Sequence, residues 1–398
     1  MAAAMVTVGL SVGATAVPVH EVLVAGLAKA QLFLVLFFAI TWLQAPAADS
    51  PALHAVRETV VSQPPGRRFV YLAASAHVLG AVLNVAGLVL LSSMVERQKD
   101  PILQRRMAAA LMQSYVVASA WSPFFVGVVV VLVALPELDW ADAVTGGGPL
   151  AILCIACAWG YDRLRYRRRP GQSKASPPVA VPLGGRHALN LICVFGSLVV
   201  IVIGAVEQTG LLLPVVLGFV APPFAMIWMA LVEGPAVTPR RSAAKLIRTV
   251  IGRTAGLRSE ALAFTASSIA GVGIAAGFPA DALGDFAGGG GWIIAGLVFG
   301  VLALGFVGLH PLVPVIIIAE ALPPDVLGLP VKIVGMCLLG VWGLTTLISP
   351  VSGTTLMMSR FVPASSYVIA WRWNSPFALL AAGAVTLFVY AAWRMELY

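Results

Sequence analysis

Charged side chains are scarce in this sequence. Asp, Glu, Lys and Arg make up 11% of the 398 residues, whereas 60% are hydrophobic. The mean hydropathy is +0.94. A soluble domain carries about 25% charged residues and cannot cover this much apolar surface. The composition therefore excludes an ordinary soluble globule. It predicts an all-α polytopic membrane protein without a sizeable soluble domain.

Motifs for enzyme chemistry and for metal binding are also missing. The four cysteines lie in apolar runs, and the single C-x-x-C pair, Cys154 and Cys157, has no histidine or second pair beside it. The sequence contains no H-E-x-x-H. The glycine run at 288–291 is not followed by the Gly-Lys-Ser/Thr of a phosphate-binding loop. We therefore expect neither an enzyme nor a resident cofactor.

Basic residues outnumber acidic ones, 25 to 17, and cluster between the hydrophobic runs. The clusters lie in 57–106, 163–187 and 240–258, whereas connections such as 136–142 and 279–285 are acidic or neutral. Basic loops are retained on the cytoplasmic side of a membrane. The pattern predicts a multi-pass protein of the inner membrane with these loops in the cytoplasm. It argues against nucleic acid as a partner.

This orientation requires two apolar runs to enter and leave the membrane on one side. Residues 69–95 have basic connections at both ends, and residues 292–321 have acidic or neutral ones. We therefore predict two re-entrant helical hairpins. The runs that follow, 107–135 and 331–360, each contain a Ser-Pro pair. Proline lacks an N–H and clashes with the preceding turn, so we predict a broken transmembrane helix in each.

The order helix, hairpin, broken helix, helix thus occurs twice with opposite orientation, which predicts two inverted-topology repeats. The Ser-Pro pair in VVASAWSPFFVG (116–127) and that in LTTLISPVSGTT (344–355) are 227 positions apart. Asn84 of the first hairpin matches His310 of the second at an offset of 226. The expected domains are the N-terminal repeat 1–162, a basic linker 163–187, a helical hairpin with a basic loop 188–258, and the C-terminal repeat 259–398.

The two breaks predict a binding site at the membrane midplane. Opened backbone is costly in hydrocarbon unless it faces protein or water. The half-helix after each break presents N–H groups to an anion, and unwound carbonyls and hydroxyls can hold Na⁺. Polar hairpin tips would lie at the same depth. The candidate substrate- and ion-binding residues are Asn84, Ser119, Ser122, Pro123, His310, Pro311, Thr345, Thr346, Ser349, Pro350, Ser352, Gly353 and Thr354.

A structural interpretation of the same residues stays open. The Ser and Thr hydroxyls can bond carbonyls of their own helix around a proline kink, and the tip residues can simply cap their hairpins. For His77 we expect a packing role. We expect Lys29 to extend toward the membrane surface. Glu320 and Lys332 are interpreted as rim residues.

The tip LGAVLNVAGLVLLSSMV (79–95) and the loops SAWSPFFVG and TLISPVSGTT resemble those of the ion transporter superfamily of secondary transporters. That group includes divalent-anion/sodium symporters, arsenite-pump membrane subunits and the large membrane subunits of TRAP transporters. The resemblance covers 20–162 and 259–393. It implies a homodimer with an elevator movement, and two half-sites: Asn84, Ser122 and Pro123 in one, and His310, Thr346, Ser349, Pro350 and Gly353 in the other.

These patterns together predict a secondary active transporter that moves a small, organic anion through the bilayer, coupled to Na⁺ or H⁺. Proton coupling would use His310, because histidine titrates near neutral pH. The alternatives are a cation/proton antiporter, a channel-like pore, and a non-transporting or partner-dependent membrane subunit. No Asp or Glu lies in either broken segment, which counts against the antiporter.

Overall fold

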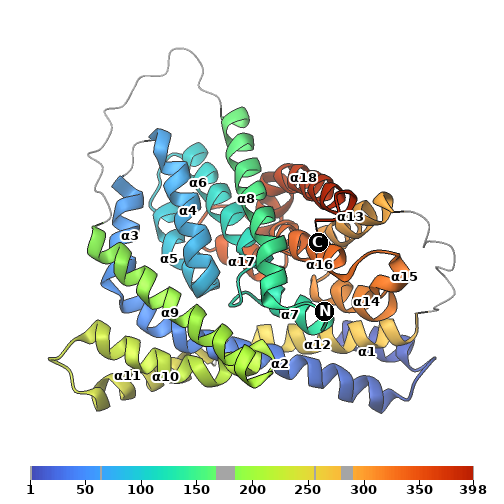
Figure 1. Cartoon of the computed structure of the whole chain (residues 1–398). Helices are drawn as coiled ribbons and strands as arrows, with labels where there is room; N and C mark the ends of the chain where they lie inside the picture. The colour runs from blue at the N-terminus through green and yellow to red at the C-terminus, as the bar shows by residue number, and fades with distance from the viewer. Residues whose placement is uncertain (1, 63–64, 167–183, 255–256, 279–289, 398) are drawn as a thin grey trace.

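The computed structural model describes residues 2–62, 65–166, 184–254, 257–278 and 290–397. Every regular element in these ranges is a helix (Figure 1), which confirms the all-α prediction. Six helices are long and apolar enough to cross a membrane. They are Val19–Asp49, Trp140–Arg165, Gly185–Thr209, Leu213–Glu233, Val331–Met358 with a break inside it, and Val368–Arg394.

One layer of helices lies across the bottom of the view in Figure 1. Its members pack on one another: α1 on α12, and α2 on α10, α11 and α12. Helix α9 runs beside α10 and also contacts α3. The bounds are α1 Ala2–Gly13, α2 Val19–Asp49, α3 Pro51–Ser62, α9 Gly185–Thr209, α10 Leu213–Glu233, α11 Pro239–Thr254 and α12 Arg258–Ala276.

Apart from α1, α2, α3 and α12, which belong to the layer, the helices of the two predicted repeats form the bundle above it (Figure 1). The N-terminal one contains α4 Pro65–Leu83, α5 Val85–Glu96, α6 Pro101–Val116, the 3₁₀ turn η1 Val117–Ala120, α7 Val126–Ala134 and α8 Trp140–Arg165. The C-terminal one contains α13 Gly291–Phe306, α14 Leu312–Ala321, α15 Pro324–Leu327, α16 Val331–Ile348, α17 Gly353–Met358, the π-helix η5 Val368–Asn374 and α18 Ser375–Arg394.

Both predicted breaks are present at the Ser-Pro pairs. The first separates η1 from α7 over residues 121–125, and the second separates α16 from α17 over 349–352. Local signals start the neighbouring helices. Asp100 caps α6 by accepting the Ile102 N–H at 2.9 Å, and Asp139 and Asp142 form a capping box at the start of α8.

Equivalent positions of the two predicted repeats meet where α16 crosses the end of α6. Val116 and Gly343 are 227 positions apart, as the Ser-Pro pairs are, and they lie against each other: a Cβ at Gly343 would sit 2.2 Å from Val116 O. Contact between equivalent residues is what an axis of symmetry produces. Ser119 donates to Val116 O at 2.7 Å, and its counterpart Thr346 donates to Gly343 O at 2.8 Å.

Several details differ from the sequence expectations. The helices α3, α11, α15 and η5 were not predicted. The first hairpin turns at one residue, Asn84, whereas the second turns over 307–311. Most of the predicted linker 163–187 and the connection 279–285 lie outside the described residues.

Lys29 has a partner that the sequence did not indicate. Its ammonium lies 2.6 Å from the Glu320 carboxylate, which ties α2 to α14, and its extension toward the membrane surface stays a prediction. Lys332 pairs with Asp142 at 2.6 Å, so it connects α16 to α8 rather than standing free at the rim. In both cases two residues far apart in sequence satisfy each other's charge, which sequence position does not reveal.

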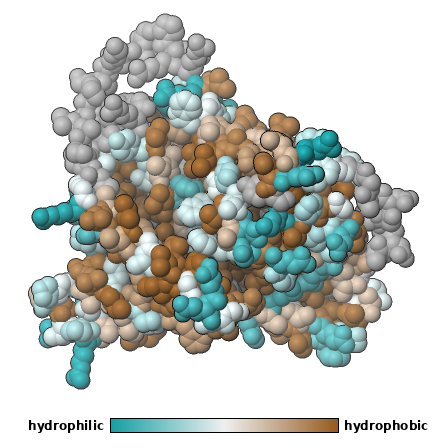
Figure 2. Space-filling view, viewed as in Figure 1, coloured by the Kyte–Doolittle hydropathy of each residue, from teal (hydrophilic) through white to brown (hydrophobic). Residues whose placement is uncertain are grey.

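Apolar side chains cover much of the outer surface, as Figure 2 shows in brown. On α9 and α10, Ile192 is 68% exposed, Val200 71% and Phe219 74%. A soluble monomer rarely exposes contiguous apolar patches of this extent. The faces of these helices are therefore suited to contact with lipid, in agreement with a multi-pass membrane protein.

Candidate functional site

Hydrogen bonds connect the tip of the first hairpin to the first break. Asn84 has φ 51° and ψ −130°, a backbone conformation that non-glycine residues seldom adopt. Its side-chain oxygen accepts the Tyr115 hydroxyl at 2.8 Å, and its amide donates to Phe124 O at 3.4 Å. The Ser122 hydroxyl donates to Ala81 O in α4 and accepts the Phe124 N–H at 3.2 Å. The polar side chains of Asn84 and Ser122 are thus both hydrogen-bonded to other groups of the protein.

Trp121, in the same break, is held by His77. The indole N–H of Trp121 donates to Nε2 of His77 at 3.1 Å, and Nδ1 of His77 faces Ser114 O at 3.2 Å. The ring is therefore a neutral tautomer with its proton on Nδ1. Trp140 donates to Trp121 O at 3.1 Å from the start of α8. These contacts agree with the packing role expected for His77.

The hydroxyls of the second break mostly bond their own backbone. Ser352 donates to Thr346 O at 2.6 Å and accepts the Thr355 N–H at 3.2 Å, which caps α17. Thr355 donates to Ser349 O at 2.7 Å, and Thr345 to Val341 O at 2.9 Å. Carbonyls freed by Pro350 are thereby satisfied. For Ser352, Thr345 and Thr346 this matches the structural interpretation, and the N-terminus of α17 is capped by its own serine.

Two hydroxyls of this segment are different. Among the described residues, no hydrogen bond joins Ser349 Oγ or Thr354 Oγ1 to the protein, and these residues are 2% and 7% exposed. The fully enclosed hydroxyls without a partner in the described structure are those of Ser114, Ser267 and Ser268. The counterpart of Ser349 in the first repeat is Ser122, which bonds α4. The two half-sites are therefore unequal, because the first is closed by its serine whereas the second keeps a hydroxyl available. Nothing within 4 Å fills the space where Gly353 would carry a Cβ.

His310 lies at the second tip between aromatic rings. Its ring centroid is 4.7 Å from that of Phe264 in α12 and 6.2 Å from that of Trp342 in α16, both edge-on. Nδ1 accepts the Leu312 N–H at 3.3 Å, so the neutral ring carries its proton on Nε2. Within the part of the chain that is described, this Nε2–H has no partner. Pro311 follows as the N-cap residue of α14.

The tips and breaks of the two repeats interlock. Trp342 covers the start of α7, where a Cβ at Gly127 would lie 2.6 Å from its ring, so the neighbour of His310 also contacts the first broken helix. Helix α7 packs on α14, and α17 packs on α5. Gly308 (φ 95°) turns the second tip, and its Cβ position is 3.6 Å from Val351 in the second break. The predicted residues of both halves therefore gather in one region.

Three cavities lie elsewhere in the described structure. One cavity of about 320 Å³ lies between α13 and α14. Its lining is apolar and includes Gly296, Gly300 and Pro314. Others of about 330 and 430 Å³ lie beside α7, α9 and α10, and beside α3 and α9. None of the three is lined by a predicted site residue.

Sequence reasoning missed several buried polar contacts beside the site. Gln113 of α6 donates to Asn374 Oδ1 at 3.1 Å, and the Asn374 amide donates to Ile369 O inside the π-helix. Arg106 binds both carboxylate oxygens of Asp162, at 2.7 and 2.6 Å. A polar residue within an apolar helix was the available signal, because such residues need a partner at membrane depth. The sequence did not indicate which residue would be the partner of each polar side chain.

Comparison with known proteins adds information on the fold. No protein-family model matches the chain, and neither does any curated protein. Among the solved structures that are similar to this chain are two transporters. MtrF of Neisseria gonorrhoeae, described as illuminating a class of antimetabolite efflux pumps, has a TM-score of 0.55 at 9% identity and covers 92% of this chain and 81% of its own. The YdaH transporter of Alcanivorax borkumensis, described as having an unusual topology, has a TM-score of 0.56 at 12% identity, with 92% and 85% covered.

At these identities the likeness concerns the fold alone. The chain has an all-α, multi-pass fold that also occurs in membrane transporters. Neither comparison tests the resemblance to the ion transporter superfamily, which stays a prediction.

Proposed function

We propose that this protein is a secondary active transporter for a small anion, coupled to Na⁺ or H⁺, and that its substrate binds where the second hairpin tip meets the second break. The observation that carries the proposal is the inequality of the two half-sites. Ser122 is closed onto α4, whereas Ser349 Oγ and Thr354 Oγ1 are free of partners among the described residues.

The free groups suit an anion. The hydroxyls of Ser349 and Thr354 and the Nε2–H of His310 are all donors, and no carboxylate lies in either broken segment to repel a negative charge. Pro350 and Gly353 keep backbone open beside them. We further propose that Asn84, Ser119, Ser122, Pro123, Thr345, Thr346 and Ser352 shape the region through their protein contacts rather than by direct contact with substrate.

Coupling has two candidate chemistries in the same region. Na⁺ would take oxygen ligands from the second break, such as Ser349 and Thr354. A proton would use His310, whose Nδ1 acceptor and Nε2 donor have different surroundings. The Na⁺ and H⁺ alternatives stay open in this proposal.

Several expectations from the sequence enter the proposal unchanged. The hairpins α4–α5 and α13–α14 would be re-entrant, the basic loops cytoplasmic, and the protein a homodimer of the inner membrane related to the ion transporter superfamily. An elevator movement would carry the hairpins past the layer of α2, α9 and α10. The Lys29–Glu320 pair joins that layer to α14, so it would have to open or move with the substrate.

A thermal-shift screen of the purified protein tests the proposal. Small carboxylates and inorganic anions are crossed with Na⁺ against K⁺ at pH 6 and pH 8. A ligand that binds the folded state stabilises it according to its concentration relative to Kd. An anion whose shift needs Na⁺ indicates sodium coupling. A shift that follows pH and is lost in His310→Ala indicates proton coupling.

Radiolabelled uptake and export in proteoliposomes then separate the remaining functions. Export deserves an arm of its own, because the similar MtrF is described among antimetabolite efflux pumps. Conductance without coupling would support a pore, and cation exchange without anion flux an antiporter. If no anion shifts the melting temperature and none moves in either direction, the transporter proposal is wrong and a partner-dependent subunit replaces it.

A further inference from the structure

Helix α11 is bound to the membrane-spanning helices by one apolar face. Leu246 and Val250 are buried and pack in a small cluster with Ala45 of α2 and with Ala225 and Met229 of α10. The helix therefore lies along the ends of two membrane-spanning helices. In Figure 1 α11 lies beside α10 at the edge of the bundle.

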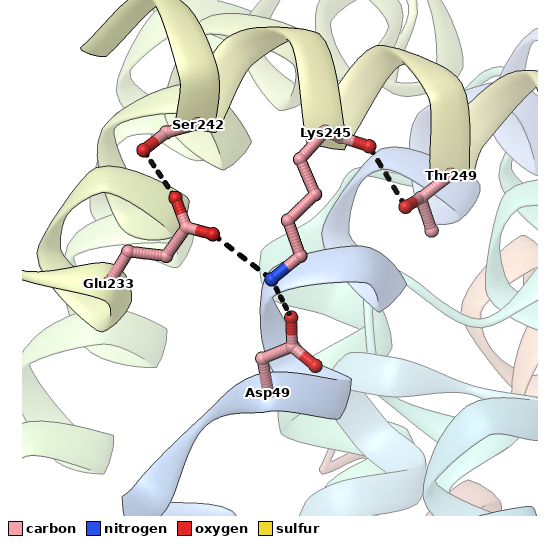
Figure 3. A network of polar contacts seen from close by, with 5 residues as sticks. All are labelled: Asp49, Glu233, Ser242, Lys245 and Thr249. Carbon is pink, nitrogen blue, oxygen red and sulfur yellow. Dashed lines mark hydrogen bonds and ion pairs between the residues drawn. The ribbon is translucent and has the colours of Figure 1, made fainter. Parts of the chain in front are cut away.

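A polar clasp fixes α11 in this position (Figure 3). Lys245 Nζ lies 2.9 Å from the Asp49 carboxylate at the end of α2 and 3.0 Å from the Glu233 carboxylate at the end of α10. Ser242, one turn earlier in α11, donates to the second Glu233 oxygen. The carboxylates of Asp49 and Glu233 thus compensate the positive charge of Lys245.

The other basic residues of α11 are not compensated. Arg240, Arg241 and Arg248 are exposed, and among the described residues none of them forms an ion pair. Ile247 and Ile251 are 40% and 67% exposed. By helical periodicity these five residues share the face opposite Leu246 and Val250. The exposed face is therefore both cationic and apolar.

We propose that this face of α11 binds the phosphate groups of anionic phospholipids, with Ile247 and Ile251 in the boundary between headgroups and acyl chains. A helix that combines exposed arginines with exposed apolar side chains lies in the membrane interface. Guanidinium groups bind phosphate in bidentate geometry, and basic residues next to a membrane attract anionic headgroups. Because Lys245 holds the helix in place, the arginines remain available to lipid. The proposal is independent of the transport function.

The test uses the purified full-length chain in a neutral detergent, titrated with short-chain phosphatidylglycerol or with phosphatidylcholine of the same chain length. The melting temperature and the lipid-bound fraction in native mass spectrometry are measured. We expect saturable binding of phosphatidylglycerol that weakens with salt. One arginine near a membrane contributes about fivefold in affinity. Arg240→Gln/Arg248→Gln should therefore weaken phosphatidylglycerol binding about 25-fold.

The matched control is Arg97→Gln/Lys99→Gln, which removes two exposed charges that form no ion pair among the described residues. It should leave phosphatidylglycerol affinity within about twofold. Equal binding of the two lipids by the wild-type protein would overturn the proposal, and so would an equal loss in both double variants. Glycerol phosphate serves as a third arm: if it stabilises the protein as well as the lipid does, a soluble phosphate compound is the ligand instead.

Discussion

Val116 and Gly343 are equivalent residues of the two repeats, and they touch: a Cβ at Gly343 would lie 2.2 Å from Val116 O and 2.8 Å from Ser119 Oγ. The contact lies between α6 and α16, six positions before the serine of each Ser-Pro pair. The region of the tips and breaks is built around this contact, so its geometry depends on how closely the two backbones approach.

Gly343 and Gly353 should respond oppositely to alanine. Gly343→Ala meets a backbone oxygen that cannot move aside, and we expect a loss of about 3 kcal/mol, the upper part of the range for overpacking. Gly353→Ala meets nothing within 4 Å and favours the first turn of α17, so stability should rise by about 0.5–1 kcal/mol. Melting temperatures in detergent measure both.

The functional consequence of the second change is separate. If a ligand approaches the backbone at Gly353, the alanine variant is well folded and binds the stabilising anion more weakly. Unchanged anion affinity in Gly353→Ala would remove this residue from the site.

Ser349 and Ser352 are three positions apart and can be compared as a matched pair of serine-to-alanine variants. Ser349→Ala removes a hydroxyl without a partner, so we expect less than about 0.5 kcal/mol change in stability and a loss of at least tenfold in anion affinity. Ser352→Ala removes the cap of α17 and the bond to Thr346 O, and should cost about 1–2 kcal/mol. Thermal shifts with and without the anion distinguish the two effects. A stable Ser349→Ala with normal affinity would contradict the site.

Asn84 should be replaceable by glycine more readily than by alanine. Both variants lose the hydrogen bonds to Tyr115 and Phe124, about 1 kcal/mol each. Only alanine also adds strain at φ 51°, about 1–3 kcal/mol. The expected order of melting temperature is wild type, Asn84→Gly, Asn84→Ala. If the two variants melt together, the tip does not keep this backbone conformation.

The ion pair between Arg106 and Asp162 should matter more than the exposed pair between Lys332 and Asp142. Asp162 is 4% exposed and would be left as an unpaired buried charge, so Arg106→Gln should cost about 3 kcal/mol. Lys332→Gln should cost much less than Arg106→Gln, because the Lys332 side chain is 45% exposed and its ion pair is screened by solvent. Unfolding in parallel detergent titrations measures the difference. Similar losses would show that burial does not decide the strength of these pairs.

The clasp of α11 predicts a dependence on alkaline pH. The pKa of Lys245 is raised, first by its hydrogen bond to Asp49 and then by that to Glu233. A cation with a raised pKa stabilises the fold below its unfolded-state pKa, about 10.4, and this contribution disappears as pH rises through the folded-state value. Wild type and Lys245→Gln should therefore differ at pH 8 and converge once the pH has risen through the folded-state pKa of Lys245. Because Lys245 is half exposed, we expect the difference at pH 8 to be about 1 kcal/mol or less.

The sequence alone determined the class of fold and the positions of its discontinuities. The long hydrophobic runs located the helices that can span a membrane, because the thickness of the bilayer sets the length of such a run. The two Ser-Pro pairs located both breaks to within a few residues, because proline disrupts the helix at its own position. Sequence also located the two tips, since a polar residue inside an apolar run is costly at membrane depth.

Only the tertiary structure decided which of these polar side chains form hydrogen bonds within the protein. Ser122 and Ser349 occupy equivalent Ser-Pro positions, yet one bonds Ala81 O across 41 positions of sequence and the other has no partner among the described residues. The same holds for Lys29, whose carboxylate partner lies in α14, far along the chain. A hydrogen bond or ion pair depends on distances of about 3 Å between groups brought together by packing, and local sequence does not contain that information.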